Sequence, residues 1–134
     1  MRDLIDLTIH EAQLAKNIQL AREKQIIFPT IEQMKQPELI PPQIKEKLGQ
    51  VGLWDVDPLN LFRITWKNEP VPKGGLFNPL PNYIEIPPAL SGVPARIFAM
   101  AGKFFPTGAH KVGATYACLV PRLVTGQFDP AYHQ

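Results

Sequence analysis

The 134 residues of this chain are enough for one domain with a buried core, and 45% hydrophobic and 19% charged residues are typical of a globular protein. A net charge of only +2, with scattered lysines and arginines, argues against a nucleic-acid-binding protein. Without a signal-peptide pattern or an apolar run of membrane-spanning length, and with one cysteine, the chain is expected to be cytoplasmic, free of internal disulfides and not bound to a membrane.

Helices are predicted in the first part of the chain. From Asp3 to Lys24, apolar residues recur at helical spacing without glycine or proline, which predicts an amphipathic helix. Thr30 is predicted to cap a short helix that ends at Met34. A further helix, Gln43–Leu48, is predicted to end at Gly49.

The middle of the chain is rich in proline and is expected to be extended and turn-rich. The composition of Leu61–Trp66 is typical of a strand. Lys73–Gly75 is predicted to be a turn, since it lacks the rest of a phosphate-binding loop. Tyr83–Ile86 is predicted to be a short strand, followed by one helical turn at Pro88–Leu90.

The last part of the chain has the pattern of a strand followed by a helix. Ala95–Ala101 is predicted to be a strand buried on at least one face, and Gly108–Val124 a helix that Pro121 bends or shortens. Cys118 lies in an apolar stretch of that helix and is expected in the core. No strand follows Gly126, so a β-α-β unit would lack its second strand.

The turn between this strand and this helix is Pro106-Thr107-Gly108-Ala109-His110-Lys111, which places His110 and Lys111 in the first helical turn. A lysine is poorly placed there, because the N-terminal end of a helix carries partial positive charge. Its position indicates a nearby anion, or an amine kept uncharged for chemistry. Pyridoxal phosphate, which has a phosphate and an aldehyde, satisfies both demands.

The same residues carry a family resemblance. Gly108–Lys111 resembles, residue for residue, the lysine motif of the tryptophan synthase β-chain family, whose fold-type-II pyridoxal-phosphate enzymes include cysteine synthase and threonine synthase. Leu119–Gly126 is similar to a segment of a cysteine-synthase-like subgroup, and the resemblance spans roughly residues 59 to 130. It implies an α/β fold: a helical, proline-rich extension over residues 1–58, then the truncated start of a parallel three-layer α/β/α domain that binds pyridoxal phosphate over residues 59–134.

The resemblance also implies roles for two residues. Lys111 matches the lysine that forms the internal aldimine with pyridoxal 5'-phosphate, and His110 matches the histidine beside the cofactor phosphate. Gly113 departs from the family, which often has a polar residue two positions after the lysine. The implied protein is a lyase or synthase that eliminates or replaces a group on a small amino-acid substrate. The rest of the enzyme, or a complementing chain, would complete it, and the complete enzyme is expected to be a homo-oligomer. The present portion alone would be inactive.

Other interpretations remain open from the residues alone. Lys111 is also compatible with a solvated helix position, and His110 with a packed or solvent-facing one. Arg63, Glu69 and Arg96 are expected on the surface, although such side chains also contact substrate carboxylates or partners. No histidine spacing indicates a metal site. The alternative function is a non-catalytic interaction module, or one subunit of a split enzyme.

Overall fold

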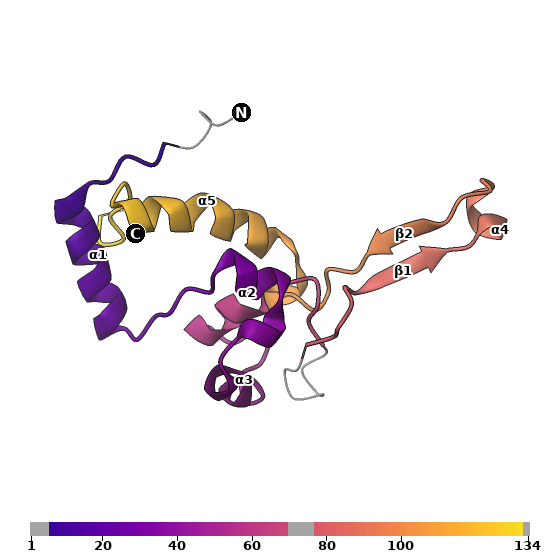
Figure 1. The fold of residues 1–134 in the computed structure, drawn as a ribbon, viewed down its shortest axis with the longest axis horizontal. Helices are drawn as coiled ribbons and strands as arrows, with labels where there is room; N and C mark the ends of the chain where they lie inside the picture. The colour runs from indigo at the N-terminus through magenta and orange to yellow at the C-terminus, as the bar shows by residue number, and fades with distance from the viewer. Residues whose placement is uncertain (1–5, 70–76, 133–134) are drawn as a thin grey trace. The chain divides into compact units, whose positions relative to one another are not determined.

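The computed structural model describes residues 6–69 and 77–132, and it combines helices with one small two-stranded sheet, a mixture compatible with an α/β class at a coarse level (Figure 1). The elements are α1 (Glu11–Glu23), α2 (Ile31–Lys35), η2 (Pro37–Leu39), α3 (Pro42–Leu48), η3 (Pro58–Arg63), β1 (Tyr83–Ile86), α4 (Pro88–Ser91), β2 (Ile97–Met100), η5 (Pro106–Gly108) and α5 (Lys111–Thr125), where η marks a 3-10 helix. The turn expected at Lys73–Gly75 lies outside the described residues.

The chain divides into two compact units. Met1–Ile27 and Gly113–Gln134 form one, which we call the terminal unit, and Phe28–Val112 forms the other, the central unit. The terminal unit contains α1 and most of α5, and the central unit contains every element from α2 to η5. The domain boundary expected at residue 58 falls inside the central unit.

In the terminal unit, α1 begins at Glu11, so the prediction of a helix already over residues 6–10 is wrong. The preceding residues use their hydrogen bonds elsewhere. Thr8 N donates to Asp6 Oδ1 over 2.9 Å, which forms a local turn, and His10 N donates to the carbonyl of Thr125 over 2.7 Å. Side chains of this kind compete with helix formation by bonding to nearby backbone. The Thr8 hydrogen bonds also lower the pKa of Asp6.

The end of α5 closes the same unit. Asn17 of α1 is buried and donates to the carbonyls of Leu123 and Phe128 over 3.0 and 2.9 Å. The helix continues through Pro121 and ends at Thr125, one residue after the predicted end at Val124, and Gly126 follows at φ +73°. This left-handed backbone is one that glycine adopts without steric cost.

Cys118 is exposed, so its predicted place in the core is wrong. Tyr116, two positions earlier in α5, is buried with 8% of its surface exposed. Because successive helical residues turn by about 100°, two positions are about 200° apart and point to opposite faces. The helix buries the face of the tyrosine and leaves the cysteine outside. Burial also raises the pKa of Tyr116 to about 12.

The core of the central unit is a small cluster of Ile40, Leu48 and Phe62, with Ile44, Leu59 and Phe77 packed against it. Directly before this core in the chain, α2 begins where the sequence predicts. Thr30 caps α2 through a hydrogen bond from Gln33 N, and the side chain of Gln33 accepts from Thr30 N in return. Such reciprocal bonds satisfy two of the donors that a helix start leaves unpaired.

The strand predicted at Leu61–Trp66 is wrong, because its first half belongs to the 3-10 helix η3. Pro58 opens that helix, and the Asp57 side chain accepts a hydrogen bond from Leu59 N over 2.8 Å. Proline at the first position together with an aspartate cap favours a helical turn over an extended strand. The surface position expected for Arg63, the last residue of η3, is wrong as well, since only 1% of its surface is exposed.

Arg63 connects the helices of the central unit. Its guanidinium donates to Leu48 O over 2.5 Å, to Val51 O over 2.6 Å and to Asn60 Oδ1 over 2.8 Å. Burial lowers the pKa of Arg63, and the charge of Asp55 partly opposes this effect. The arginine therefore supplies a donor to the carbonyl of Val51 and a second donor to the carbonyl of Leu48, which also accepts from Val51 N over 3.1 Å.

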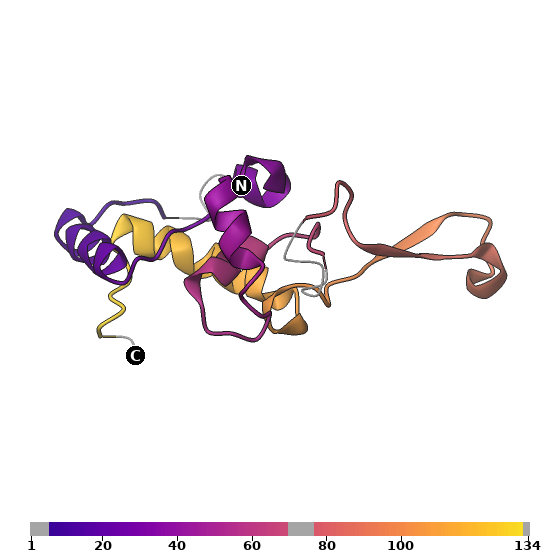
Figure 2. The ribbon, with the colours of Figure 1, turned by 90° about the horizontal axis from the view of Figure 1, so that it is seen from below.

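Strands β1 and β2 lie where the sequence predicts, and they pair antiparallel with Tyr83 opposite Met100 (Figures 1 and 2). The figures show α4 at the tip between them, and Gly92 ends α4 at φ +70°. The described strands form no parallel pair. A connection this short permits only the antiparallel arrangement, since parallel strands need a long crossover. Three of the four β2 residues are exposed, so the predicted burial of this strand is wrong.

Candidate functional site

The lysine motif lies in a loop between β2 and α5, which we call the lysine loop (Gly102–Lys111). The predicted strand-to-helix turn is present as η5, but α5 begins at Lys111, three positions after the expected start. Thr107 and Gly108 explain the delay, because both have left-handed backbone, at φ +61° and +69°. A threonine in this region is sterically unfavourable and is held there by its surroundings.

Three long-range hydrogen bonds hold the lysine loop and its approach in the central unit. Thr107 N donates to the carbonyl of Leu53 over 2.9 Å. Asn68 Nδ2 donates to the carbonyl of Phe104 over 3.0 Å. Directly before the loop, Ala101 N donates to the carbonyl of Asn82 over 2.9 Å. The segment between the helices and the hairpin therefore supports the residues that lead to Lys111.

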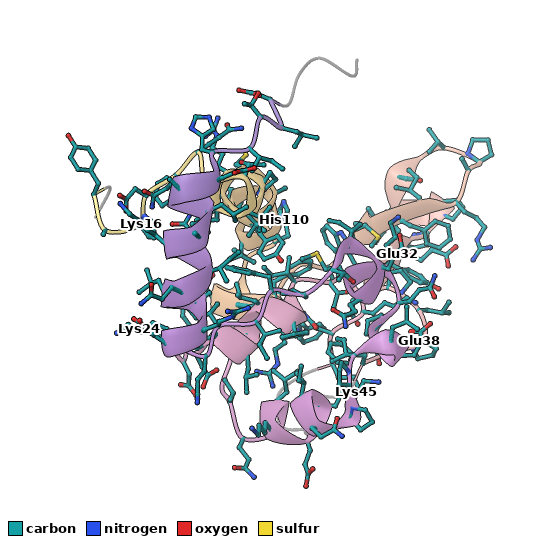
Figure 3. All side chains as sticks on the ribbon, turned by 60° about the vertical axis from the view of Figure 1, so that its left-hand side comes forward. Lys16, Lys24, Glu32, Glu38, Lys45 and His110 are labelled. Carbon is teal, nitrogen blue, oxygen red and sulfur yellow. The ribbon has the colours of Figure 1, made fainter. Side chains whose placement is uncertain are left out.

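His110 immediately precedes α5 and is exposed, and its side chain is labelled in Figure 3. Its ring stacks on the indole of Trp66, with 5.5 Å between ring centroids and 27° between planes. Gly102 lies close to the same histidine: a Cβ atom placed on it would be 3.1 Å from His110 Cβ and 3.2 Å from Nδ1. The imidazole is thus restricted by an aromatic face and by a close backbone approach.

Lys111 is the first residue of α5 and is exposed. Two properties of this position fit a ligand with an anionic group and an aldehyde. The first N–H groups of a helix attract anions, and an exposed lysine is accessible to an electrophile. A third property, exclusion of water from the amine, is not provided by the described residues, which leave Lys111 exposed.

The other charged residues considered from sequence do not meet at this loop. Arg63 is buried in the central unit and contacts η3 and the end of α3. Arg96 instead pairs with Glu85 across the hairpin, at 2.8 Å between Nε and Oε1. This hydrogen bond lowers the pKa of Glu85. The two arginines therefore have structural partners, and the structure brings together only His110 and Lys111.

A cavity of about 550 Å³ lies elsewhere in the central unit. It is lined by Pro37, Glu38, Lys45, Lys67, Glu69, Phe77, Asn78 and Pro79. Lys45 Nζ donates to the carbonyl of Glu38 over 3.0 Å, and both residues are labelled in Figure 3. The lining carries two cations and two anions, so it presents no dominant charge, and neither His110 nor Lys111 belongs to it.

Two residues that support the lysine loop were not identified from sequence as functional. Trp66 contacts both His110 and Phe105, the latter edge-on at 5.0 Å between centroids. Asn68 is buried, with only 2% of its surface exposed, and its side-chain amide donates to the carbonyls of Arg63 and Phe104. Its Oδ1 has no hydrogen-bond partner among the described residues. Their aromatic and amide character was visible in the sequence, but their distant partners were not.

No protein-family model, curated protein or solved structure matches this chain. Within residues 6–69 and 77–132, no group of three or more His, Cys, Asp or Glu side chains is arranged to hold a metal ion. In the same ranges no helix combines the length and apolar character needed to cross a membrane. The enzyme assignment therefore depends on the motif and on the local geometry around it.

Proposed function

We propose that the chain is the N-terminal portion of a pyridoxal-phosphate-dependent lyase or synthase of amino-acid metabolism, with Lys111 as the residue that binds the cofactor covalently. The observation that carries the proposal is the position of Lys111: it is an exposed lysine that opens a helix of 15 residues directly after a left-handed turn. The resemblance of Gly108–Lys111 to the tryptophan synthase β-chain motif supplies the choice of cofactor.

Each residue has a chemical task in this proposal. Pyridoxal phosphate, when bound, supplies an aldehyde for attachment and a ring that accepts an electron pair. Lys111 Nζ would hold the cofactor covalently through its aldehyde carbon, with the carbonyl oxygen leaving as water. When the amino-acid substrate takes its place on the cofactor, the freed Nζ would act as the general base for the proton on the α-carbon of the substrate. His110 would bind the phosphate beside the first turn of α5.

A second part of the protein would desolvate the exposed Lys111 and add to the reactivity that its position in the lysine loop alone gives. An ammonium group in water is a poor nucleophile, and desolvation favours the neutral amine. The covering surface would come from the remainder of the enzyme or from a complementing chain, as part of a homo-oligomer. The small amino-acid substrate would bind in the space that the two parts enclose.

The test measures where the cofactor reacts. The purified chain is incubated with limiting pyridoxal phosphate, reduced with borohydride and digested, and the label on each lysine is quantified by mass spectrometry. Lys103 is the matched reference, since it is an exposed lysine of the same loop. Preferential labelling of Lys111 is expected, and Lys111→Ala should remove it while Lys103→Ala does not. Equal labelling of both lysines contradicts the proposal.

A second candidate function is an interaction module, which the hairpin favours. The strand register places Ile84, Ile86, Ile97 and Ala99 on one face, and Ile84 is 64% exposed. An isolated two-stranded sheet is marginally stable in water, so an aliphatic face of this kind favours a covering partner. A folded monomer of 15.0 kDa in which Lys111 reacts no faster than Lys103 would support this module.

A further inference from the structure

We propose that Trp66 is a positioning residue for the lysine loop: it holds the imidazole of His110 by stacking and so fixes the group that meets the cofactor phosphate. The inference rests on the proposed function for the identity of the ligand. It adds a residue that lies outside the lysine motif and belongs to the segment between η3 and β1.

The aromatic contacts of Trp66 carry the first step of the argument. Phe105 meets the indole edge-on, with 5.0 Å between centroids and 76° between planes. His110 stacks on it, with 5.5 Å between centroids and 27° between planes. Both are residues of the lysine loop, so one indole contacts it at two points. Edge-on and stacked rings at these separations are the favoured aromatic geometries.

The backbone of Trp66 is held by hydrogen bonds. The carbonyl of Trp66 accepts hydrogen bonds from Asn82, from the backbone N over 2.8 Å and from Nδ2 over 3.1 Å. Thr65 and Asn68 on either side of it are buried, and Asn68 also donates to the carbonyl of Phe104 in the lysine loop. The carbonyl of Trp66 is therefore held by Asn82 at the start of the hairpin, while its indole contacts the lysine loop.

The His110 side chain is also close to the backbone of Gly102. Gly102 approaches His110 so closely that a methyl group there would lie 3.1 Å from Cβ, which is tighter than ordinary van der Waals contact. A side chain already held in one orientation loses less conformational entropy when it binds a ligand. Trp66 should therefore increase the affinity of this position for a phosphate, without touching the phosphate or Lys111.

The test compares two aldehydes on the unmodified chain and on four variants, Trp66→Leu, Trp66→Phe, His110→Ala and the double variant of His110→Ala with Trp66→Leu. Labelling rates of Lys111 by pyridoxal phosphate and by pyridoxal, which lacks the phosphate, are each divided by the rate at Lys103. Their ratio is the phosphate preference. Trp66→Leu should lower this preference roughly two- to tenfold, the size expected for the loss of one aromatic pair. Trp66→Phe, which retains an aromatic ring, should keep most of the phosphate preference. In a chain that already carries His110→Ala, adding Trp66→Leu should have no further effect on this preference.

The outcomes separate this inference from the proposed function. If Lys111 of the unmodified chain reacts no faster than Lys103, the proposed function fails, and the phosphate role of Trp66 fails with it. If Lys111 reacts preferentially and Trp66→Leu keeps the full phosphate preference, only the inference is overturned. If Trp66→Leu fails to fold, its circular dichroism signal falls, and Trp66→Phe is then the deciding variant. If Trp66→Phe folds normally but loses the phosphate preference, the inference is also overturned.

A direct measurement of the stacked pair completes the test. The ring protons of His110 are expected at shifted NMR frequencies because they lie over the indole of Trp66. This shift should disappear in Trp66→Leu and persist in Trp54→Phe, where the other tryptophan is changed. An unchanged His110 spectrum in Trp66→Leu overturns the positioning role whatever the labelling shows.

Discussion

Replacing Arg63 by methionine should destabilise the central unit by about 2–4 kcal/mol, a large part of the ~5–15 kcal/mol that keeps a domain folded. Methionine retains much of the length of the side chain but donates no hydrogen bond. Three acceptors, Leu48 O, Val51 O and Asn60 Oδ1, would lose the guanidinium at distances of 2.5, 2.6 and 2.8 Å. A buried acceptor left without a donor costs ~1–3 kcal/mol.

A second effect opposes this loss. The guanidinium is only 1% exposed, and removing a charge from water costs several kcal/mol, which methionine does not incur. The lowered pKa of Arg63, caused first by burial, has the same origin. We expect the lost bonds to exceed the relieved desolvation, since the acceptors of the buried residues Val51 and Asn60 would lose the guanidinium donor, whereas Leu48 O would keep its bond from Val51 N.

Urea unfolding followed by tryptophan fluorescence measures this effect in the correct unit, because both tryptophans, Trp54 and Trp66, belong to the central unit. Arg96→Met is the matched control: the same chemical change at a side chain that is 71% exposed should not measurably alter the unfolding midpoint. Equal or higher stability of Arg63→Met would show that the desolvation cost outweighs the hydrogen bonds, and would refute the reasoning.

Three further predictions follow from backbone geometry and from titrating groups. Thermal unfolding should show a larger loss of stability for Gly126→Ala than for Gly92→Ala. Both substitutions place an alanine at positive φ, which costs ~1–2 kcal/mol. At position 126 the new Cβ would also overlap backbone atoms at the start of α1, whereas nothing lies within 4 Å of it at position 92. Stability linked to Tyr116 should be present below pH 10.0 and be lost as the pH rises to about 12, because burial raises its pKa; the late step in tyrosinate absorbance should be absent in Tyr116→Phe. The carboxyl of Glu85 should titrate below 4.5 in NMR spectra, so that its contribution is lost only as the pH falls through that lowered pKa, and Arg96→Gln should return it toward the ordinary value.

Local signals in the sequence predicted some of the element ends, whereas the starts of α1 and α5 and the bounds of β2 differ from the prediction. The cap at Thr30 and the strand Tyr83–Ile86 are confirmed, and the end of α5 at Thr125 lies one residue after the predicted one. Each is specified by residues within a few positions: a threonine with a glutamine three places on, alternating β-formers between prolines, and a glycine directly after the helix. Interactions within one turn of chain are visible without knowledge of the fold.

Long-range partners explain what the sequence did not predict. Arginine is usually a surface residue, and Arg63 can be buried only because the carbonyl groups of Leu48 in α3 and of Val51 just after α3 accept its hydrogen bonds. Cys118 lies in an apolar stretch, but the packing of Tyr116 decides which face of α5 is buried. The start of α1 depends on Thr125, more than a hundred residues away along the chain. Composition and periodicity contain none of these distances.

The candidate site shows the same division. The order of strand, turn and helix predicted both His110 and Lys111 in the first turn of α5; this is confirmed for Lys111, whereas His110 lies one position before the helix, because the left-handed Thr107 and Gly108 delay its start. The sequence indicated only that Trp66 is an apolar residue that packs. Its stacking on His110 joins a residue before the hairpin to one after it along the chain, and this long-range contact is not visible in the sequence. The position of a motif was predictable from sequence, whereas the residues that support it were not.

The structure separates two requirements of the proposed chemistry, position and desolvation. Position is supplied within the central unit, where the stacked His110 and the hydrogen bond from Thr107 N to Leu53 O fix the approach to α5. Desolvation of the Lys111 amine is not supplied by the described residues, because Lys111 is exposed and water strongly weakens the field of a helix end. A surface that covers Lys111 should therefore accelerate its labelling by pyridoxal phosphate while leaving Lys103 unchanged. If such a partner accelerates both lysines equally, its effect is general and the cofactor proposal loses its physical basis.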